Sequence, residues 1–196
     1  MKKVLSILCI VFLFFSISGI HANENDSQNL DPWLGVFHDS LNSGYSNSIA
    51  QPPLKEAWVF ESDYGQRSSL SGSSVIYNGI LYTQFMTNIQ GRTSEIIAVD
   101  MENGEEIWRT EIEGRLVRGC PVISTDNEMI YTASTDGYAS RSSSKGNSLI
   151  NAIYLEDGEI NWTTKIDGAI FSSIFYGDGG LYVNPLFVQE VIGKDW

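Results

Sequence analysis

The chain has 196 residues, with 24 acidic side chains against 12 basic ones, a net charge of −12 and a pI of about 4.4. A protein that binds duplex nucleic acid needs a basic face to neutralise phosphates, so this charge excludes that class. Two cysteines are too few for a disulfide-stabilised scaffold, and a hydrophobic content of 42% excludes a disordered chain.

Residues 1–22 have the layout of a secretory signal peptide. Lys2 and Lys3 precede an uncharged apolar run from Val4 to Ile20, and Ala22 precedes a polar, acidic stretch. We predict cleavage after Ala22, which removes two lysines and no acid and so changes the net charge from −12 to −14. The alternative is an uncleaved membrane anchor, although the run is shorter than the roughly 20 apolar residues that span a bilayer. We expect an exported protein that is periplasmic, extracellular or on the cell surface, with a membrane attachment only through an uncleaved signal.

Cleavage would leave Cys120 as the only cysteine, which excludes an internal disulfide. It begins the apolar stretch 120–123 (Cys-Pro-Val-Ile). A single cysteine in such a stretch behaves as a small apolar side chain, so we predict that it is buried.

Residues 23–54 form an N-terminal lead-in segment and linker, which ends in Pro52-Pro53-Leu54. His38 would be the only histidine after cleavage, so a Ser-His-Asp triad would have to use it. Because Asp39 follows His38 directly, we interpret this histidine as a structural tie within the segment.

Residues 55–196 contain a repeat of about 50 residues with two landmarks. The stretch 98–108 recurs at 152–162, with alanine, glycine, glutamate and tryptophan at the same offsets. Its repeated positions are Ala98, Asp100, Gly104 and Trp108, then Ala152, Gly158 and Trp162. The second landmark is a turn followed by a tyrosine, at Tyr82, Tyr131 and Tyr182, which are 49 and 51 residues apart. Two landmarks with one period indicate a repeat architecture.

Each repeat is typical of short β-strands separated by turns, and no window beyond the signal segment has the helical period. Asn78-Gly79 between two β-rich runs is a strong hairpin signal. The expected strands are 73–77, 80–85, 95–100 and 105–110 in the first repeat, and 120–124, 129–133, 149–154 and 159–164 in the second.

Four short strands in a repeat of this length are the signature of a β-propeller blade. We therefore predict an all-β fold, a partial and open β-propeller of about two and a half to three four-stranded blades. The blades would cover about 55–110, 111–164 and 165–196, the last of them incomplete. Closed propellers need about four to eight blades, so missing repeats or another copy would have to close the ring.

The repeated residues have structural roles in this interpretation. Gly104 and Gly158 would supply a positive φ at the turn between the third and fourth strands. The alanines would allow close packing between blades. Trp108 and Trp162 would bridge adjacent blades, with the indole N–H donating to a backbone carbonyl of the neighbour.

The repeat resembles that of the pyrroloquinoline-quinone-like (PQQ-like, or quinoprotein-type) β-propeller proteins, which carry Ala-x-Asp-x-x-x-Gly-x-x-x-Trp after Asn/Asp-Gly-x-Val/Leu-Tyr. The first copy matches fully, whereas Tyr154 stands where the second would have aspartate. The lead-in segment resembles that family's Trp…His-Asp-x-x-Asn-x-Gly-Tyr segment. The matching residues are Trp33, His38, Asp39, Asn42, Gly44 and Tyr45. The resemblance covers about residues 32–183 and implies the N-terminal part of such a protein, truncated after Trp196.

The resemblance also implies quinone-dependent dehydrogenase chemistry as one candidate. Such enzymes generally hold PQQ with an adjacent cysteine pair, a stacking tryptophan and a calcium ion. Cys120 alone cannot form the pair, and the repeat already uses Trp58, Trp108 and Trp162. We therefore expect neither PQQ nor calcium on this chain. The sequence also lacks a Cys/His cluster with zinc-ligand spacing.

The connection 136–148 is long and locally basic, with Arg141 and Lys145 among serines. It is either a mobile surface loop or a contact site for an acidic partner. The sequence favours an exported, non-enzymatic propeller module that acts as a protein-binding or assembly scaffold. The alternatives are the N-terminal fragment of a PQQ-dependent dehydrogenase and a truncated gene product without independent function.

Overall fold

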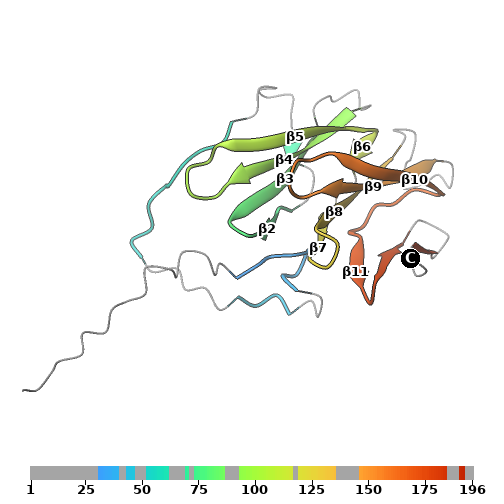
Figure 1. Ribbon diagram of the computed structural model, residues 1–196, viewed down its shortest axis with the longest axis horizontal. Helices are drawn as coiled ribbons and strands as arrows, with labels where there is room; N and C mark the ends of the chain where they lie inside the picture. Colours follow the sequence, from blue (N-terminus) through green and yellow to red (C-terminus); the bar gives the residue numbers. More distant parts are fainter. Residues whose placement is uncertain are drawn as a thin grey trace, which may run out of the picture.

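The computed structural model describes residues 31–39, 43–46, 52–61, 69–70, 73–86, 93–116, 119–135, 146–184 and 190–192. The signal segment, Asn42 and the basic connection with Arg141 and Lys145 lie outside these residues, so the predictions for them stay predictions. Every regular element in the described part is a β-strand, and the strands form three antiparallel sheets (Figure 1). The predicted all-β, partial-propeller fold class is therefore confirmed.

The first sheet contains four strand positions. Its outer three strands are β3 (Ile80–Met86), β4 (Thr93–Asp100) and β5 (Glu106–Glu113). The strands β1 (Ser69–Leu70) and β2 (Val75–Tyr77) both pair with the same side of β3. They therefore act as one interrupted inner strand, and the sheet is a four-stranded blade.

The second sheet repeats this arrangement. The strands β6 (Arg115–Leu116) and β7 (Val122–Ser124) share β8 (Met129–Thr135), which is followed by β9 (Asn147–Tyr154) and β10 (Ile160–Asp167). The turns between the third and fourth strands are equivalent, because Gly104 and Gly158 have φ values of 77° and 76°. Positive φ is the conformation that glycine adopts without steric penalty.

The third sheet contains β11 (Phe175–Gly177), β12 (Gly180–Val183) and β13 (Glu190–Ile192), in that order. By comparison with the other two sheets, these strands occupy the first three positions of a blade. No described strand fills its fourth position.

The hairpin turns of the first strand pairs also repeat. Asn78 and Gly79 both have positive φ, and so do Asp178 and Gly179. Two residues with positive φ match the right-handed twist of the flanking strands, which is why Asn-Gly and Asp-Gly pairs are favoured there.

The core lies between successive sheets. One apolar cluster combines Tyr82, Ile96 and Trp108 of the first sheet with Ile130 and Ile153 of the second. A second cluster joins the second sheet to the third and to the segment that leads into it. Its members include Tyr131, Ala152, Ile166, Ile170, Ile174, Leu181 and Val183. The sheets therefore pack as consecutive propeller blades do.

The lead-in segment lies against the inner strands of the first two blades (Figure 1). Trp33 and Ile76 exchange two backbone hydrogen bonds of 2.8 and 2.7 Å, and the Ile123 N–H donates to the Leu34 carbonyl at 2.9 Å. One short segment thus ties β2 of one blade to β7 of the next.

Candidate functional site

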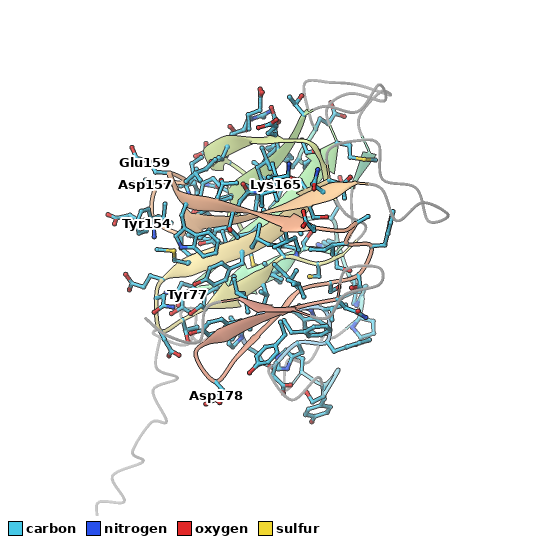
Figure 2. The ribbon with its side chains drawn as sticks, turned by 90° about the vertical axis from the view of Figure 1, so that its right-hand side faces the viewer. Tyr77, Tyr154, Asp157, Glu159, Lys165 and Asp178 are labelled. Carbon is cyan, nitrogen blue, oxygen red and sulfur yellow. The ribbon has the colours of Figure 1, made fainter. Side chains whose placement is uncertain are left out.

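The turns within β2–β3, β4–β5, β7–β8, β9–β10 and β11–β12 lie at one end of the blades, because alternate connections of an antiparallel sheet share an end. We call this end the turn face, defined by residues 78–79, 101–105, 125–128, 155–159 and 178–179. Figure 2 shows Asp157 and Glu159 at the β9–β10 turn, with Tyr154 beside them, and Asp178 at the tip of the β11–β12 hairpin.

Tryptophans connect the blades at the turn face. The Trp108 indole N–H, from β5, donates to the Leu155 carbonyl of the next blade at 2.9 Å. The Trp58 indole N–H donates to the Met101 carbonyl at the same distance. Trp58 and Trp108 therefore each dock on the turn between the third and fourth strands of the following blade.

The turn glycines lie directly under these rings. A Cβ atom at Gly104 would lie 2.8 Å from Trp58 Cδ2, and one at Gly158 would lie 2.6 Å from Trp108 Cε3. Heavy atoms do not approach this closely, so both positions require glycine for space as well as for φ.

The repeated alanines lie in cross-strand rows. Tyr82 and Trp108 flank Ala98 on neighbouring strands, and their ring centroids are 5.7 Å apart. Ala98 is fully buried, and its single methyl group lets the two rings approach each other. The equivalent row of the second blade is Tyr131, Ala152 and Trp162, with a ring distance of 5.9 Å. Tyr182 holds the matching position of the third sheet and is 37% exposed.

The turns between the third and fourth strands of the two blades begin with different side chains, Asp100 in the first blade and Tyr154 in the second. The Asp100 carboxylate accepts a hydrogen bond of 2.7 Å from the Glu102 N–H. Tyr154 replaces this aspartate in the second blade, and it is 39% exposed next to the turn face. The substitution exchanges a turn-stabilising carboxylate for an aromatic surface.

In the lead-in segment, His38 lies between two carboxylates. Its Nε2 atom is 3.1 Å from Asp31 Oδ1, its Nδ1 atom is 3.7 Å from Asp39 Oδ2, and its ring packs edge-on against Trp33. Asp39 also accepts two hydrogen bonds from Ser43, at 3.0 and 2.7 Å. The closer carboxylate is therefore that of Asp31 rather than the adjacent Asp39. The remaining described residues of the motif are Gly44, with a φ of 62°, and Tyr45, which is 66% exposed.

A groove of about 590 Å³, here called the lead-in groove, separates this segment from the third sheet. Phe175 and Tyr182 line one wall and are 42% and 37% exposed. Its apolar lining comes from Leu34, Val36, Val122, Ile123 and Ile174, and its carboxylates are Asp39, Asp126 and Asp178. The groove thus joins an apolar floor to aromatic and acidic edges.

A second groove, here called the blade groove, lies between the first two blades and has a volume of about 530 Å³. Three tyrosines, Tyr77, Tyr82 and Tyr154, line it together with Glu128 and Glu156. Burial raises the pKa of Tyr82 to about 12. Tyr154 brings its aromatic ring into this groove at the position where the first blade has Asp100.

The turn face is strongly acidic. Eight carboxylates lie within its turns, at Glu102, Glu105, Asp126, Glu128, Glu156, Asp157, Glu159 and Asp178. Asp100 directly precedes the turn 101–105. The turns contain no lysine or arginine. Among the basic side chains that are described, Lys55 is exposed in the segment 52–61, and Arg109 lies within β5, where Glu95 and Glu106 bind it. Lys165 lies near the other end of β10. The turn face therefore presents a negative field to a partner.

Cys120 is buried, with 4% of its surface exposed. Burial raises the pKa of its thiol to about 12, and its Sγ atom lies 3.6 Å from the Ser73 carbonyl oxygen. A protonated, enclosed thiol is chemically inert.

The described residues do not assemble the quinone-binding set that the resemblance implies. Cys120 has no neighbouring cysteine, and the rings of Trp58 and Trp108 lie against turn glycines instead of an open pocket. No group of three metal-binding side chains gathers within the described ranges. In the same ranges there is no helix that is long and apolar enough to cross a membrane.

The comparison with known proteins agrees with the repeated blade geometry. The model of a PQQ-repeat family, described as "Outer membrane protein assembly factor BamB", matches residues 92–189, which is half of the chain. The chain belongs to this PQQ-like β-propeller repeat family. The match begins at β4 and extends into the third sheet, so it includes both Trp108 and the Gly158 turn. No curated protein sequence matches the chain.

Solved structures are similar to this PQQ-like chain in fold. A europium-containing methanol dehydrogenase matches 82% of the chain at 15% identity with a TM-score of 0.57, and the chain covers 29% of that protein. BamB from Moraxella catarrhalis matches 59% of the chain at 14% identity with a TM-score of 0.37, and the chain covers 41% of it. The chain thus spans less than half of either protein.

The grooves were not predicted from the sequence. The lead-in groove draws its lining from four segments between residues 34 and 182, and none of these segments carries a binding motif. For the blade groove, Tyr154 was the one signal in the sequence, because it breaks the repeat at a position where aspartate is usual.

Proposed function

We propose that this chain is an exported, non-enzymatic β-propeller module that binds a protein segment on its turn face. The observation that carries the proposal is the lead-in groove, where an apolar floor meets exposed aromatic rings and carboxylates. The chemistry of this groove suits a segment that alternates apolar and basic side chains.

The apolar part of the groove would supply most of the binding free energy. Phe175 is 42% exposed and Tyr182 is 37% exposed, so a partner could still bury much of both rings. Aromatic side chains that are accessible beside a depression are typical anchors of protein interfaces.

The carboxylates would determine which partners bind. Asp126 and Asp178 both line the groove, at the β7–β8 and β11–β12 turns. A negative field accelerates the association of basic partners and disfavours acidic ones. An assembly role, as the description of the BamB family suggests, would use the face in this way. The basic connection with Arg141 and Lys145 is a further proposed contact, for an acidic partner.

A peptide titration tests the proposal. The probe is a ten-residue peptide of alternating lysine and leucine, and the control peptide replaces each lysine by glutamate. We expect saturable binding of the lysine peptide, no binding of the glutamate peptide, and weaker binding at higher salt because exposed charges are screened. Equal binding of both peptides would contradict the proposal.

Two variants distinguish the groove from general charge attraction. Phe175→Ser removes an exposed ring and should weaken binding of the lysine peptide at least about tenfold, in line with the loss of an interface anchor. Lys165→Ser changes a charged residue away from the turn face and should leave the affinity unchanged. If Phe175→Ser binds as the wild type does, the groove is not the binding site.

A further inference from the structure

Two residues of the second blade depart from the repeat, and both of them line the blade groove. Tyr154 stands where the first blade has Asp100. Glu128, which directly precedes β8, stands where the first and third blades have Gly79 and Gly179. Positions that break the rule of a fold are expected where a protein has a role beyond folding. The groove that collects both departures is therefore a candidate site.

The backbone of Glu128 is in an unfavourable conformation. Its φ is 53°, in the left-handed region that costs a residue with a side chain free energy. The equivalent glycines have φ values of 75° and 69°, and a Cβ atom at either would meet nothing within 4 Å. Conformation, rather than space, thus favours glycine at this position. The second blade carries a carboxylate here in spite of that cost, as residues at functional sites do.

The blade groove combines an apolar interior with acidic side chains that face solvent. Tyr82 and Leu155 are buried, whereas Tyr154, Glu128 and Glu156 are exposed. The lining contains neither lysine nor arginine. Within the described part of the chain, no ion pair includes the carboxylate of Glu128 or Glu156. The charge of the groove therefore suits a cation.

Tyrosines reach this groove from both blades. Tyr77 lies on β2 and Tyr82 on β3 of the first blade, and Tyr154 ends β9 of the second. Figure 2 shows Tyr77 and Tyr154 on the same side of the molecule as Asp178, which marks the turn face. The faces of aromatic rings carry negative charge density and attract organic cations.

The lining suits a methylated cation better than a metal ion or a primary ammonium group. A calcium ion takes six or more oxygen ligands, and the described residues gather no group of three metal-binding side chains. A primary ammonium group needs acceptors for three N–H donors, which the rings and apolar side chains of the interior do not provide. A quaternary ammonium group has no such donors, so an aromatic interior can replace its water.

We propose that the blade groove binds a small, free quaternary ammonium cation of the choline type. The methylated group would lie against the rings of Tyr77 and Tyr154, and Glu128 and Glu156 would supply the counter-charge. This site shares no lining residue with the lead-in groove. The inference therefore goes beyond the proposed function and does not depend on it.

Calorimetric titration of the chain with choline chloride tests the proposal. The matched ligand is neopentyl carbinol, in which a carbon atom replaces the choline nitrogen, so that shape is kept and charge is lost. We expect saturable binding of choline and at least about tenfold weaker binding of the neutral analogue, because the attraction to aromatic rings requires a cation. Equal affinities, or no binding of choline at millimolar concentration, would overturn the proposal.

A third ligand tests whether the cation is free or part of a lipid headgroup. Phosphocholine carries the same ammonium group with an added phosphate, which Glu128 and Glu156 would repel. We expect phosphocholine to bind more weakly than choline. Equal or tighter binding of phosphocholine would indicate a lipid headgroup and overturn the assignment to a free cation.

Substitutions at Tyr154 separate the ring from the charge. Tyr154→Asp restores the residue of the first blade and removes the ring while adding a carboxylate. It should weaken choline binding at least about fivefold, whereas Tyr154→Phe keeps the ring face and should bind as the wild type does. The lysine-and-leucine peptide should bind Tyr154→Asp unchanged, so failure here is distinct from failure of the proposed function. Unchanged choline affinity in Tyr154→Asp would overturn the proposal.

A matched pair of carboxylates tests the counter-charge. Glu156 and Glu102 occupy the same turn position in the second and first blades, and only Glu156 lines the groove. Glu156→Gln should weaken choline binding by about threefold, in the range of an exposed charge pair, and Glu102→Gln should leave it unchanged. Equal losses in the two variants would indicate general charge attraction and overturn the site.

Glu128→Gly tests whether the strained carboxylate serves binding or folding. Glycine removes the side chain and adopts the left-handed conformation without penalty. We expect weaker choline binding together with a urea midpoint equal to or above that of the wild type. A lower midpoint with unchanged choline affinity would show that Glu128 supports the fold and would overturn its role in the groove.

Discussion

The Trp108 indole N–H donates a hydrogen bond of 2.9 Å to the Leu155 carbonyl oxygen, and this bond crosses from one blade to the next. It links a side chain of β5 to the turn that follows β9, which are 47 residues apart. The ring also covers Gly158, so one tryptophan satisfies a turn carbonyl and excludes water from the junction. Cooperation between the blades depends on this contact, because neighbouring repeats stabilise each other through their shared interface.

Trp108→Phe should lower the free energy of unfolding by about 1–3 kcal/mol, because it leaves the buried Leu155 carbonyl without its donor. Urea denaturation measures the change. Trp162→Phe is the matched control, since within the described residues its indole N–H has no hydrogen-bond partner. If both variants lose the same stability, the loss reflects ring size and not the hydrogen bond.

Gly158→Ala should destabilise the protein more than Gly79→Ala does. Both glycines have a φ near 76°, so either alanine adds about 1–2 kcal/mol of backbone strain. A Cβ at Gly79 meets nothing within 4 Å, whereas one at Gly158 meets the Trp108 ring and Thr110 Oγ1 at 2.6–2.7 Å. Overpacking should add about 1–3 kcal/mol to Gly158→Ala alone. Equal urea midpoints for the two variants would contradict the close packing of Gly158 against the Trp108 ring.

Arg109→Met should lower the free energy of unfolding by an amount between about 1 kcal/mol, typical of exposed ion pairs, and about 3 kcal/mol, typical of buried ones. Arg109 donates hydrogen bonds to both Glu95 and Glu106. These bonds raise the pKa of its guanidinium, and the bond with Glu106 has the largest effect. Its loss leaves the Glu95 carboxylate, which is only 5% exposed, without this counter-charge.

The rescue variant separates charge from packing. Adding Glu95→Gln to Arg109→Met should restore part of the stability, because the amide has no charge to bury. If the stability lost by the double variant equals the sum of the losses in Arg109→Met and Glu95→Gln, the two side chains are not coupled.

Stability should decrease as the pH rises from about 9 toward 12. Burial raises the pKa of Cys120 from 9.0 to about 12 and that of Tyr82 from 10.0 to about 12. The folded protein therefore retains protons that the unfolded chain releases, and the free energy of unfolding falls over this range. Comparing urea midpoints at pH 8 and 11 for Cys120→Ala and the parent, both with Cys9→Ser, isolates the thiol. A pH effect that is equal in the two proteins would contradict the contribution of Cys120.

The blade strands could be predicted from the sequence because the same local signals occur twice. Asn78-Gly79 marks a hairpin by its backbone preference alone, and β3 begins at Ile80 as expected. The outer strands continue to Glu113 and Asp167, about three residues beyond the predicted ends. Ile112 and Ile166 are buried in these extensions, so packing on the neighbouring blade lengthens the strands.

The binding face could not be predicted in the same way. His38 lies closer to Asp31 than to the adjacent Asp39, because the backbone folds back between Leu34 and His38. The lead-in groove exists only because the segment around Leu34 meets the third sheet across the β7–β8 turn. Contacts between distant segments without a repeat leave no periodic signal in a single sequence.

The most direct test of the account is to map the lysine-and-leucine peptide on the protein by the change in backbone amide NMR shifts. We predict the largest changes at Gly35, Thr125 and Tyr176, which line the lead-in groove, and none at Thr93 and Asp167, at the other end of the blades. Shifts centred on that other end, or spread evenly over all acidic residues, would contradict a binding site on the turn face.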